Sequence, residues 1–291
     1  MTILVFGKSG QVAQSLAERE GAAPAPLAFL GRDQADLSRP EQCAAAIFER
    51  RPCAVINAAA WTAVDAAEDS ESEAKIVNGD SPGVMAATCA ELAIPFLHAS
   101  SDYVFDGSGA LPWRPDSPLA PLGAYGRSKA LGERRVRESG ARAAILRTSW
   151  VFSPFGSNFV KTMLRLGSER KTLSVVDDQI GGPTSAQSLA GALLAMAAQM
   201  LAGKAGGTYH FSGRPTVSWA VFANAIMTQA NLACEIIPIP SSAYPTPTPR
   251  PLNSRLDCGS IFADFGVSQS DWRTDLIDVI EQLRMESILD T

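Results

Sequence analysis

Two side chains one helical turn apart could carry out proton transfer. Tyr125 and Lys129 stand in the stretch Tyr125-Gly-Arg-Ser-Lys129, and residues at positions i and i+4 of a helix share one face. A free tyrosine has a pKa of about 10, but a nearby cation favours the phenolate and lowers that value. We therefore predict that Lys129 lowers the pKa of Tyr125 and that Tyr125 gives a proton to a carbonyl oxygen. The same spacing also occurs between ordinary helix neighbours, so the pair alone does not define a site.

A polar run precedes this pair by about twenty residues. Ser100-Ser101-Asp102-Tyr103 ends an apolar stretch that begins at Pro95. If that stretch is a parallel strand, its carboxyl end lies where open α/β sheets bind ligands. A serine hydroxyl there can hold a carbonyl oxygen, although serines at strand ends also serve as turn residues. We interpret Ser101 as the residue that orients the carbonyl group.

A glycine-rich turn follows the first apolar run of the chain. Gly7-Lys8-Ser9-Gly10-Gln11-Val12-Ala13 places Gly7 where the chain turns sharply and Gly10 where the backbone must approach a diphosphate. The free N–H groups of the helix that follows attract phosphate, and Ala13 still allows this helix to pack closely on the strand. Such a loop alone can be structural, but its place at the start of an α/β chain predicts a dinucleotide site.

The end of the second expected strand bears on the choice of dinucleotide. A carboxylate there favours NAD by binding the ribose 2′-hydroxyl, whereas this chain has Gly31-Arg32. A guanidinium can stack on adenine or bind a 2′-phosphate with two hydrogen bonds, so we predict NADPH. Asp33 beside it leaves NADH open.

The first half of the sequence, which must position these residues, alternates short apolar runs with helical patterns. This alternation is typical of βαβ units around a parallel sheet. We expect a doubly wound α/β fold of the Rossmann type. The predicted strands are 2–7, 26–31, 54–60, 95–104, 143–151 and 207–212, and the predicted helices are 11–20, 41–51, 83–92, 125–139 and 185–201.

The pattern becomes less regular beyond Phe152, which indicates a second, smaller domain that is discontinuous in sequence. We assign residues 1–152 and 185–213 to a dinucleotide-binding domain. Residues 153–184 and 214–291 then form a substrate-binding domain. The proline-rich segment from Pro238 to Pro251 should run along the surface in an extended form, since proline does not suit the interior of a helix or sheet.

Composition excludes several classes of protein. The net charge is -5 and the sequence has no basic cluster, so we expect no positively charged surface that would bind nucleic acid or an anionic membrane. No apolar run is long enough to span a membrane and no signal peptide is evident, so we expect a cytoplasmic protein. The five cysteines are scattered without a CxxC pair, and their odd number argues against a disulfide framework. His98 and His210 lie in separate predicted strands, so we expect no metal site.

The order of these motifs resembles the extended short-chain dehydrogenases/reductases and, within them, the dTDP-4-dehydrorhamnose reductase family. Nearly the whole chain takes part in the resemblance. The stretches that carry it are Phe6-Gly-Lys-Ser-Gly-Gln-Val12, Asn57-Ala-Ala-Ala-Trp-Thr-Ala-Val-Asp65, Ser101-Asp-Tyr-Val-Phe105, Tyr125 to Lys129, Arg147-Thr-Ser-Trp-Val-Phe152, Asp178-Gln-Ile-Gly-Gly-Pro-Thr184 and Arg250-Pro-Leu-Asn-Ser-Arg-Leu256.

The resemblance implies a reaction and a set of contacts. The substrate would be dTDP-4-dehydro-6-deoxy-L-mannose, reduced at C4 with NADPH or NADH to dTDP-L-rhamnose. Ser101 and Asp102 would contact the sugar, Trp150 would pack on it, and Arg250 would either bind the nucleotide's phosphates or cap its own surface loop. The dinucleotide contacts would be Gly10, Gln11 and Val12 at the diphosphate, Asp36 and Leu37 at the adenine, and Ala60, Trp61 and Thr62 at the nicotinamide.

Two departures narrow these expectations. Related dehydratases carry Asp-Glu after the strand-end threonine, and here Tyr103 occupies the place of the glutamate, which disfavours elimination of water. Some family members form a dimer through Mg²⁺ held by carboxylates at positions that correspond to Ser15 and Gln187. A hydroxyl and an amide are poor ligands for this cation, so we predict no metal-bridged dimer and expect a monomer or a weak homodimer.

Two rival functions remain open. One is a catalytically silent regulatory subunit that binds NADP(H) without turnover, as in the regulatory subunit of methionine adenosyltransferase, which is built on the same fold. One observation argues against this rival: the chain has Ser101, Tyr125, Lys129 and Trp150 together. A silent subunit would have no chemical need for this set. The other rival is a reductase of a different nucleotide-linked keto sugar.

Overall fold

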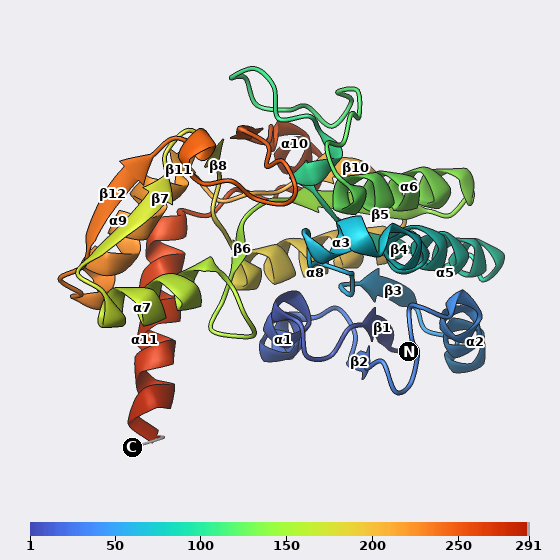
Figure 1. Ribbon diagram of the computed structural model, residues 1–291. Coiled ribbons are helices and arrows are strands. Elements are labelled where there is room, and N and C mark those ends of the chain that lie inside the picture. The colour runs from blue at the N-terminus through green and yellow to red at the C-terminus, as the bar shows by residue number, and fades with distance from the viewer. Residues whose placement is uncertain (290–291) are drawn as a thin grey trace.

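A six-stranded parallel sheet forms the centre of the protein. The computed structural model describes the backbone of residues 1–289 and the side chains of residues 1–285 (Figure 1). The strands lie in the order β10-β5-β4-β3-β1-β2, and each neighbouring pair is parallel. Their bounds are β1 Ile3–Phe6, β2 Leu27–Leu30, β3 Ala54–Asn57, β4 Phe96–Ser101, β5 Ala143–Thr148 and β10 Gly207–His210. The prediction of a doubly wound α/β fold is confirmed.

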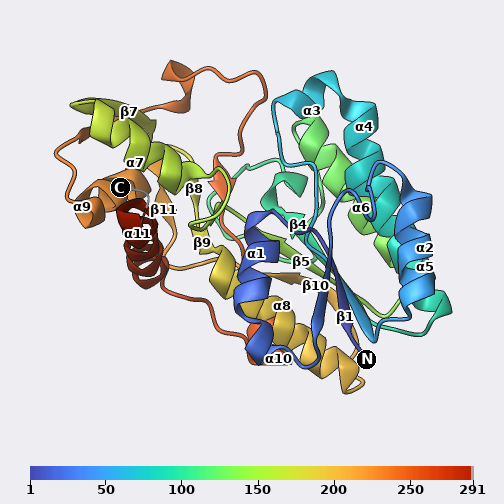
Figure 2. The same ribbon diagram turned by 90° about the horizontal axis from the view of Figure 1, so that it is seen from below.

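Helices cover both faces of this sheet (Figure 2). Side chains that point to one face of the sheet, such as Ile3 and Val5, pack with α1 (Gln11–Glu18) and α8 (Ala186–Leu201). Side chains that point to the opposite face, such as Leu4 and Phe6, pack with α2 (Pro40–Arg50), α5 (Ser81–Glu91) and α6 (Ala124–Glu138). A strand buried on both faces is continuously apolar, which explains why these strands stand out in the sequence.

The strand order reverses between β1 and β3. The chain passes from β1 outward to β2, returns to β3 on the other side of β1, and continues to β10. The loops after β1 and β3 therefore diverge at the carboxyl edge of the sheet, which is where doubly wound folds bind ligands. The glycine-rich turn lies at this edge, between β1 and α1.

A second group of elements packs around its own apolar core (Figure 1). It includes α7 (Phe159–Glu169), α9 (Trp219–Ala230) and α11 (Trp272–Leu289), with the parallel pair β7 (Thr172–Val176) and β12 (Glu235–Ile239). The remaining elements are β6 (Val151–Phe152), β8 (Ile180–Gly181), β9 (Thr184–Ser185), β11 (Val217–Ser218), β13 (Asn253–Ser254), α3 (Ala66–Asp69), α4 (Glu71–Lys75), α10 (Gly259–Phe265), the 3-10 helices η1 (Glu20–Ala22), η3 (Asp102–Val104) and η4 (Ser241–Ala243), and the π-helical turn η2 (Ile76–Asp80).

Several predicted elements were wrong in part. The strand expected over 95–104 ends at Ser101, after which the 3-10 helix η3 begins. The strand expected over 143–151 breaks at Trp150, whose φ of +51° is left-handed, and β6 beyond it pairs with β9 instead of joining the main sheet. The proline-rich segment begins inside a strand, because Pro238 and Ile239 belong to β12 and pair with Val175 and Val176. Proline is tolerated there because β12 is an edge strand. None of the described helices is both long and apolar enough to cross a membrane.

Candidate active site

The turn after β1 has the shape that a diphosphate requires. Gly7 has a φ of +113°, which L side chains rarely adopt. Gly10 precedes α1 with no side-chain cap, and a Cβ at this position would meet no atom within 4 Å. The backbone N–H groups at the start of α1 are therefore open to an anion. Ala13 packs under Gly7, since the Cβ of Ala13 would lie 3.5 Å from a Cβ at Gly7.

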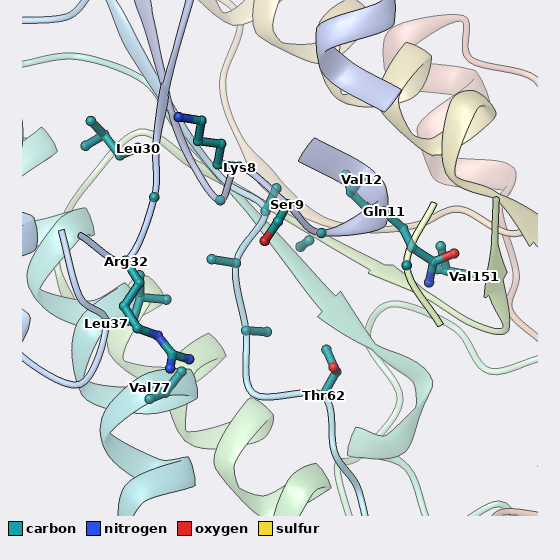
Figure 3. Close-up of a pocket in the computed structure, with 18 of the residues that line it drawn as sticks. Lys8, Ser9, Gln11, Val12, Leu30, Arg32, Leu37, Thr62, Val77 and Val151 are labelled. Carbon is teal, nitrogen blue, oxygen red and sulfur yellow. The ribbon is translucent and has the colours of Figure 1, made fainter. Parts of the chain in front are cut away.

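A cavity of about 560 Å³ opens over this turn (Figure 3). Its volume lies within the range of small-molecule sites. Figure 3 shows Gln11 and Val151 at one end of the cavity and Arg32, Leu37 and Val77 at the other. The predicted dinucleotide contacts that line it are Gly7, Gly10, Gln11, Val12, Arg32, Asp36, Leu37, Ala60, Thr62, Tyr125 and Lys129. These residues fit a dinucleotide. The turn at Gly7 and Gly10 exposes backbone without side chains, Arg32 supplies a guanidinium at one end, and Tyr125 and Lys129 place a phenol and an ammonium in the wall.

Arg32 and Asp36 give charge to one end of the cavity (Figure 3). A hydrogen bond from the backbone N–H of Ser38, 2.9 Å from Asp36 Oδ1, lowers the pKa of the Asp36 carboxyl, and Arg32 and Arg39 lower it further. Lys8 also lines the cavity. The positive charges of Arg32 and Lys8 in the cavity lining favour a ligand with additional negative charge.

Tyr125 lies in the first turn of α6. Gly123 precedes the helix, and Glu68 accepts a hydrogen bond from the Ala124 N–H at 2.7 Å. A carboxylate at a helix N-terminus is stabilising, so Glu68 holds the turn that carries Tyr125. Burial raises the pKa of Tyr125 to about 12, and a hydrogen bond with Ser101 opposes this rise. The phenol is therefore protonated at neutral pH.

Lys129 follows one turn later and is buried. Burial lowers the pKa of the Lys129 ammonium to about 8, and its Nζ donates to the carbonyl oxygen of Ala99 at 2.8 Å. The expectation that Lys129 lowers the pKa of Tyr125 was wrong in this structure. The group that lowers it is the Ser101 hydroxyl, and desolvation of the phenol outweighs that contribution.

Ser101 and Asp102 end β4 beside the phenol. Ser101 Oγ donates to Asp102 Oδ1 at 3.0 Å and accepts from the Tyr103 N–H at 3.2 Å. Burial raises the pKa of Asp102 to about 6, against hydrogen bonds from Ser254 and Ser101. The rings of Tyr103 and Tyr125 meet edge to face at 5.4 Å. Two phenols, a hydroxyl and a buried carboxyl group thus converge at the end of this strand.

Five predicted contacts do not line the cavity. Besides Ser101 and Asp102, they include Trp61, whose backbone N–H and C=O bind the Asn78 amide at 2.8 and 3.0 Å. The ring of Trp61 packs in the small apolar cluster that contains Tyr125. The remaining two are Trp150 and Arg250.

Trp150 stacks on Trp219 with ring centroids 3.6 Å apart. Its other neighbour is Gly181, where a Cβ would come within 2.7 Å of the indole. The ring is thus held between α9 and β8, beside the cavity wall that Val151 forms.

Arg250 forms an ion pair with Asp65, with 2.7 Å between Nη2 and Oδ2. Burial raises the pKa of Asp65, but Arg250 and Thr248 outweigh it and hold the pKa below its usual value. Within the described part of the chain, Arg250 Nη1 is buried and has no hydrogen-bond partner. Arg250 therefore fastens the proline-rich segment to the loop after β3 and keeps one amino group unused.

Two features of the site were missed from the sequence. The segment 153–158 reaches the diphosphate turn: Ser153 Oγ and Asn158 Nδ2 donate to Gln11 Oε1 at 2.8 and 3.1 Å, and Gly156 and Ser157 line the cavity. Nothing in its sequence signals this, because the contact joins residues more than 140 positions apart. Glu133 is the other feature, and its spacing of four residues from Lys129 was a usable signal.

Of the two positions considered for a bridging metal, Gln187 belongs to an internal hydrogen-bond network. Gln187 donates to Glu18, and Arg19 Nε donates to Gln187 Oε1 at 2.7 Å. Ser15 is buried. Arg19 places a positive charge beside the amide, which opposes a cation there. Across the residues that the structure describes, no three His, Cys, Asp or Glu side chains form a metal-binding group.

The fold and this cavity define a dinucleotide-dependent oxidoreductase of the short-chain dehydrogenase/reductase type. The model of the family "RmlD substrate binding domain" matches residues 1–285, and the chain belongs to that family. It is 45% identical over 286 residues to a dTDP-4-dehydrorhamnose reductase from Burkholderia thailandensis, covering 94% of this chain and 96% of the relative.

Two solved structures extend the similarity to the whole fold. A dTDP-4-dehydrorhamnose reductase from Clostridium acetobutylicum superposes with a TM-score of 0.92 at 30% identity, covering 98% of this chain and 100% of the other. A dTDP-4-dehydrorhamnose reductase from Bacillus anthracis, solved in complex with NADP, superposes with a TM-score of 0.89 at 30% identity, covering 97% and 99%.

Proposed function

We propose that this protein reduces the C4 keto group of dTDP-4-dehydro-6-deoxy-L-mannose (dTDP-4-dehydrorhamnose) with NADPH to give dTDP-L-rhamnose. The observation that carries the proposal is the position of Tyr125, a protonated and buried phenol in the wall of a dinucleotide-sized cavity, on which the Ser101 hydroxyl acts. Relatives that are 37–45% identical to this chain are named dTDP-4-dehydrorhamnose reductase.

The chain's own residues supply the proton and the orientation. A bound nicotinamide supplies the hydride that goes to C4. Ser101 turns its hydroxyl hydrogen from Asp102 Oδ1 to the C4 oxygen, and Tyr125 Oη gives its proton to the same oxygen as charge develops there. Lys129, fixed on the Ala99 carbonyl, ties α6 to β4 and so keeps the Tyr125 hydroxyl beside Ser101.

The remaining roles in the cavity follow from position. Gly7, Gly10, Gln11 and Val12 bind the diphosphate, Asp36 and Leu37 border the adenine, and Arg32 binds the 2′-phosphate of NADPH, while NADH binds without that contact. Ala60, Trp61 and Thr62 hold the nicotinamide side. On the substrate side, Asp102 contacts the sugar, Trp150 packs against it, and the unused Nη1 of Arg250 binds a phosphate oxygen.

The other expectations stand as proposals. Residues 1–152 and 185–213 bind the dinucleotide. Residues 153–184 and 214–291 bind the sugar nucleotide, although α10, which belongs to this second set, packs on α8 and β10.

The protein is a monomer or weak homodimer without bridging Mg²⁺, so its sedimentation coefficient should be the same with and without Mg²⁺. We place it in the cytoplasm, whose reducing conditions suit five unpaired cysteines. It binds no nucleic acid.

The test is to follow NADPH absorbance with purified protein and dTDP-4-dehydro-L-rhamnose. Oxidation of NADPH that depends on the sugar supports the proposal. A protein that binds NADPH but does not oxidise it would be the silent subunit. Turnover with another nucleotide-linked keto sugar, but not with this one, would assign a different substrate to the same chemistry.

A further inference from the structure

Glu133 is the third polar residue buried along one face of α6. It follows Tyr125 and Lys129 at successive intervals of four residues, and its side chain is 0% exposed. Its Oε1 accepts from Ser100 Oγ at 2.7 Å and from Arg147 Nε at 2.8 Å. Its Oε2 accepts from Arg147 Nη2 at 2.7 Å and from Nη1 of the half-exposed Arg137 at 3.2 Å. The mechanism above gives Glu133 no role.

Stability alone is a weak reason for this buried pair. Replacing a buried ion pair by apolar residues of similar volume is often neutral or stabilising, because desolvation offsets the attraction of the charges. Arg147 is also fixed by Pro115, whose carbonyl oxygen lies 3.0 Å from Nη1, and by His210 at 3.2 Å. The guanidinium therefore holds Glu133 at a defined place, between Ser100 and the ammonium-bearing turn of α6.

The charged groups around Lys129 show how the Glu133 carboxylate affects its ammonium group. Glu133 on α6 raises the pKa of Lys129 against the effect of burial. On β4, burial and Lys129 both lower the pKa of His98, so this ring is neutral. Arg147 on β5 is a second buried cation, and Asp102 acts on Tyr125. Glu133 is thus the anion that offsets the two buried cations, Lys129 and Arg147, on this face of the sheet.

We propose that Glu133 is a positioning residue for the reduction: its buried carboxylate keeps the Lys129 side chain protonated and holds Ser100 beside it. The reaction named here rests on the proposed function, but the effect on Lys129 does not, so it can be measured without substrate. Arg147 acts through Glu133 by holding the carboxylate in place.

The first test is an NMR titration of ¹³C-labelled lysine in the protein, with the Lys129 signal assigned from Lys129→Arg. Glu133→Gln keeps the size and removes the charge. Opposite charges within a few ångströms shift a pKa by about 1–3 units, so Lys129 should titrate about 1–3 pH units lower in this variant. An unchanged titration in the folded variant overturns the proposal.

A matched control lies on the same helix. Arg127 on α6 binds Glu71 with two hydrogen bonds of 3.0 and 2.8 Å, but this pair is partly exposed and lies away from Lys129. Glu71→Gln should leave the Lys129 titration where it is. An equal shift in the control would show a general effect of charge removal and would contradict the proposal.

A second pair of variants covers the case in which Glu133→Gln does not fold because Arg147 is left unpaired. The double variant Glu133→Gln/Arg147→Met is compared with Arg147→Met alone, which isolates the carboxylate in a background without the buried guanidinium. Arg137, which also binds Glu133 Oε2, is present in both proteins. Lys129 should titrate lower in the double variant. Equal titrations in the two proteins would overturn the proposal.

Activity supplies the remaining readout. The high-pH limb of the kcat/KM profile should move to lower pH in Glu133→Gln by the shift measured for Lys129. A lower melting temperature with the limb unmoved would show a purely structural role and contradict the proposal. If the protein does not reduce the keto sugar at all, the proposed function fails while the titration result stands.

Discussion

Lys129 Nζ lies 2.8 Å from the carbonyl oxygen of Ala99, two residues before Ser101 on the same strand. This bond ties α6 to β4, so the helix that carries Tyr125 and the strand that carries Ser101 hold a fixed spacing. The ammonium is buried and donates here to a neutral carbonyl group. The ammonium is therefore held at one place in the cavity wall, on the helix face that also carries Tyr125.

Removing the phenolic oxygen tests the proton donor. Tyr125→Phe should lower kcat by about 10²–10⁴-fold, the usual contribution of a general acid, and should leave the Kd for NADPH unchanged. Tyr209→Phe is the matched control, because burial also raises the pKa of Tyr209 to about 12 and its hydroxyl binds Asp264, away from the cavity. Near-normal turnover in Tyr125→Phe would reassign the proton.

Arg32 should set the choice of cofactor. Hydrogen bonds to charged groups contribute about 1.5–3 kcal/mol, so Arg32→Ala should lower the ratio of kcat/KM for NADPH to that for NADH by roughly 10- to 100-fold. Arg39→Ala is the control, since Arg39 also acts on Asp36 but does not line the cavity. A ratio that Arg32→Ala leaves unchanged removes Arg32 from the 2′-phosphate site.

Asp102 should reduce stability at neutral pH. Its pKa is 3.8 in the unfolded reference and about 6 in the folded protein, so between these values the folded state binds more protons and the free energy of unfolding falls as pH rises. The loss above pH 6 is at most about 3 kcal/mol. Asp102→Asn should therefore raise the melting temperature at pH 7.5, with a gain that vanishes below about pH 4, and should lower kcat/KM for the sugar nucleotide. No gain in stability at pH 7.5 would contradict a buried ionised carboxyl group.

Gly181 should control the position of Trp150. A Cβ at this position would lie 2.7 Å from the indole, and overpacking costs about 1–3 kcal/mol. Gly181→Ala should change tryptophan fluorescence and raise KM for the sugar nucleotide, with NADPH binding unchanged. Gly21→Ala, where a Cβ meets no atom within 4 Å, should change none of these. An unchanged KM in Gly181→Ala would remove Trp150 from the substrate site.

The parts of the fold that depend on local pattern could be predicted from the sequence. Strands such as β1 and β3 are buried on both faces and are continuously apolar, and the turn at Gly7 needs a residue that tolerates positive φ. Helix α6 follows the same logic, since Tyr125 and Lys129 share a face. These features depend on residues that are neighbours in the chain.

The features that could not be predicted depend on distant contacts or on burial. Arg250 is fixed by Asp65, 185 residues away, and Gln11 by Ser153 and Asn158 in the smaller group of elements. The protonation of Tyr125 was misjudged because the sequence shows which cation is near but not how completely the phenol is desolvated. That balance depends on the packed structure.

Deuterium transfer tests the central claim most directly. The protein is incubated with dTDP-4-dehydro-L-rhamnose and NADPH deuterated at C4 of the nicotinamide, prepared as each stereoisomer, and the product is examined by mass spectrometry and NMR. We predict dTDP-L-rhamnose with one deuterium at C4 of the sugar from one of the two stereoisomers. Unreduced keto sugar, or a product without deuterium at C4 from either stereoisomer, would contradict the assignment.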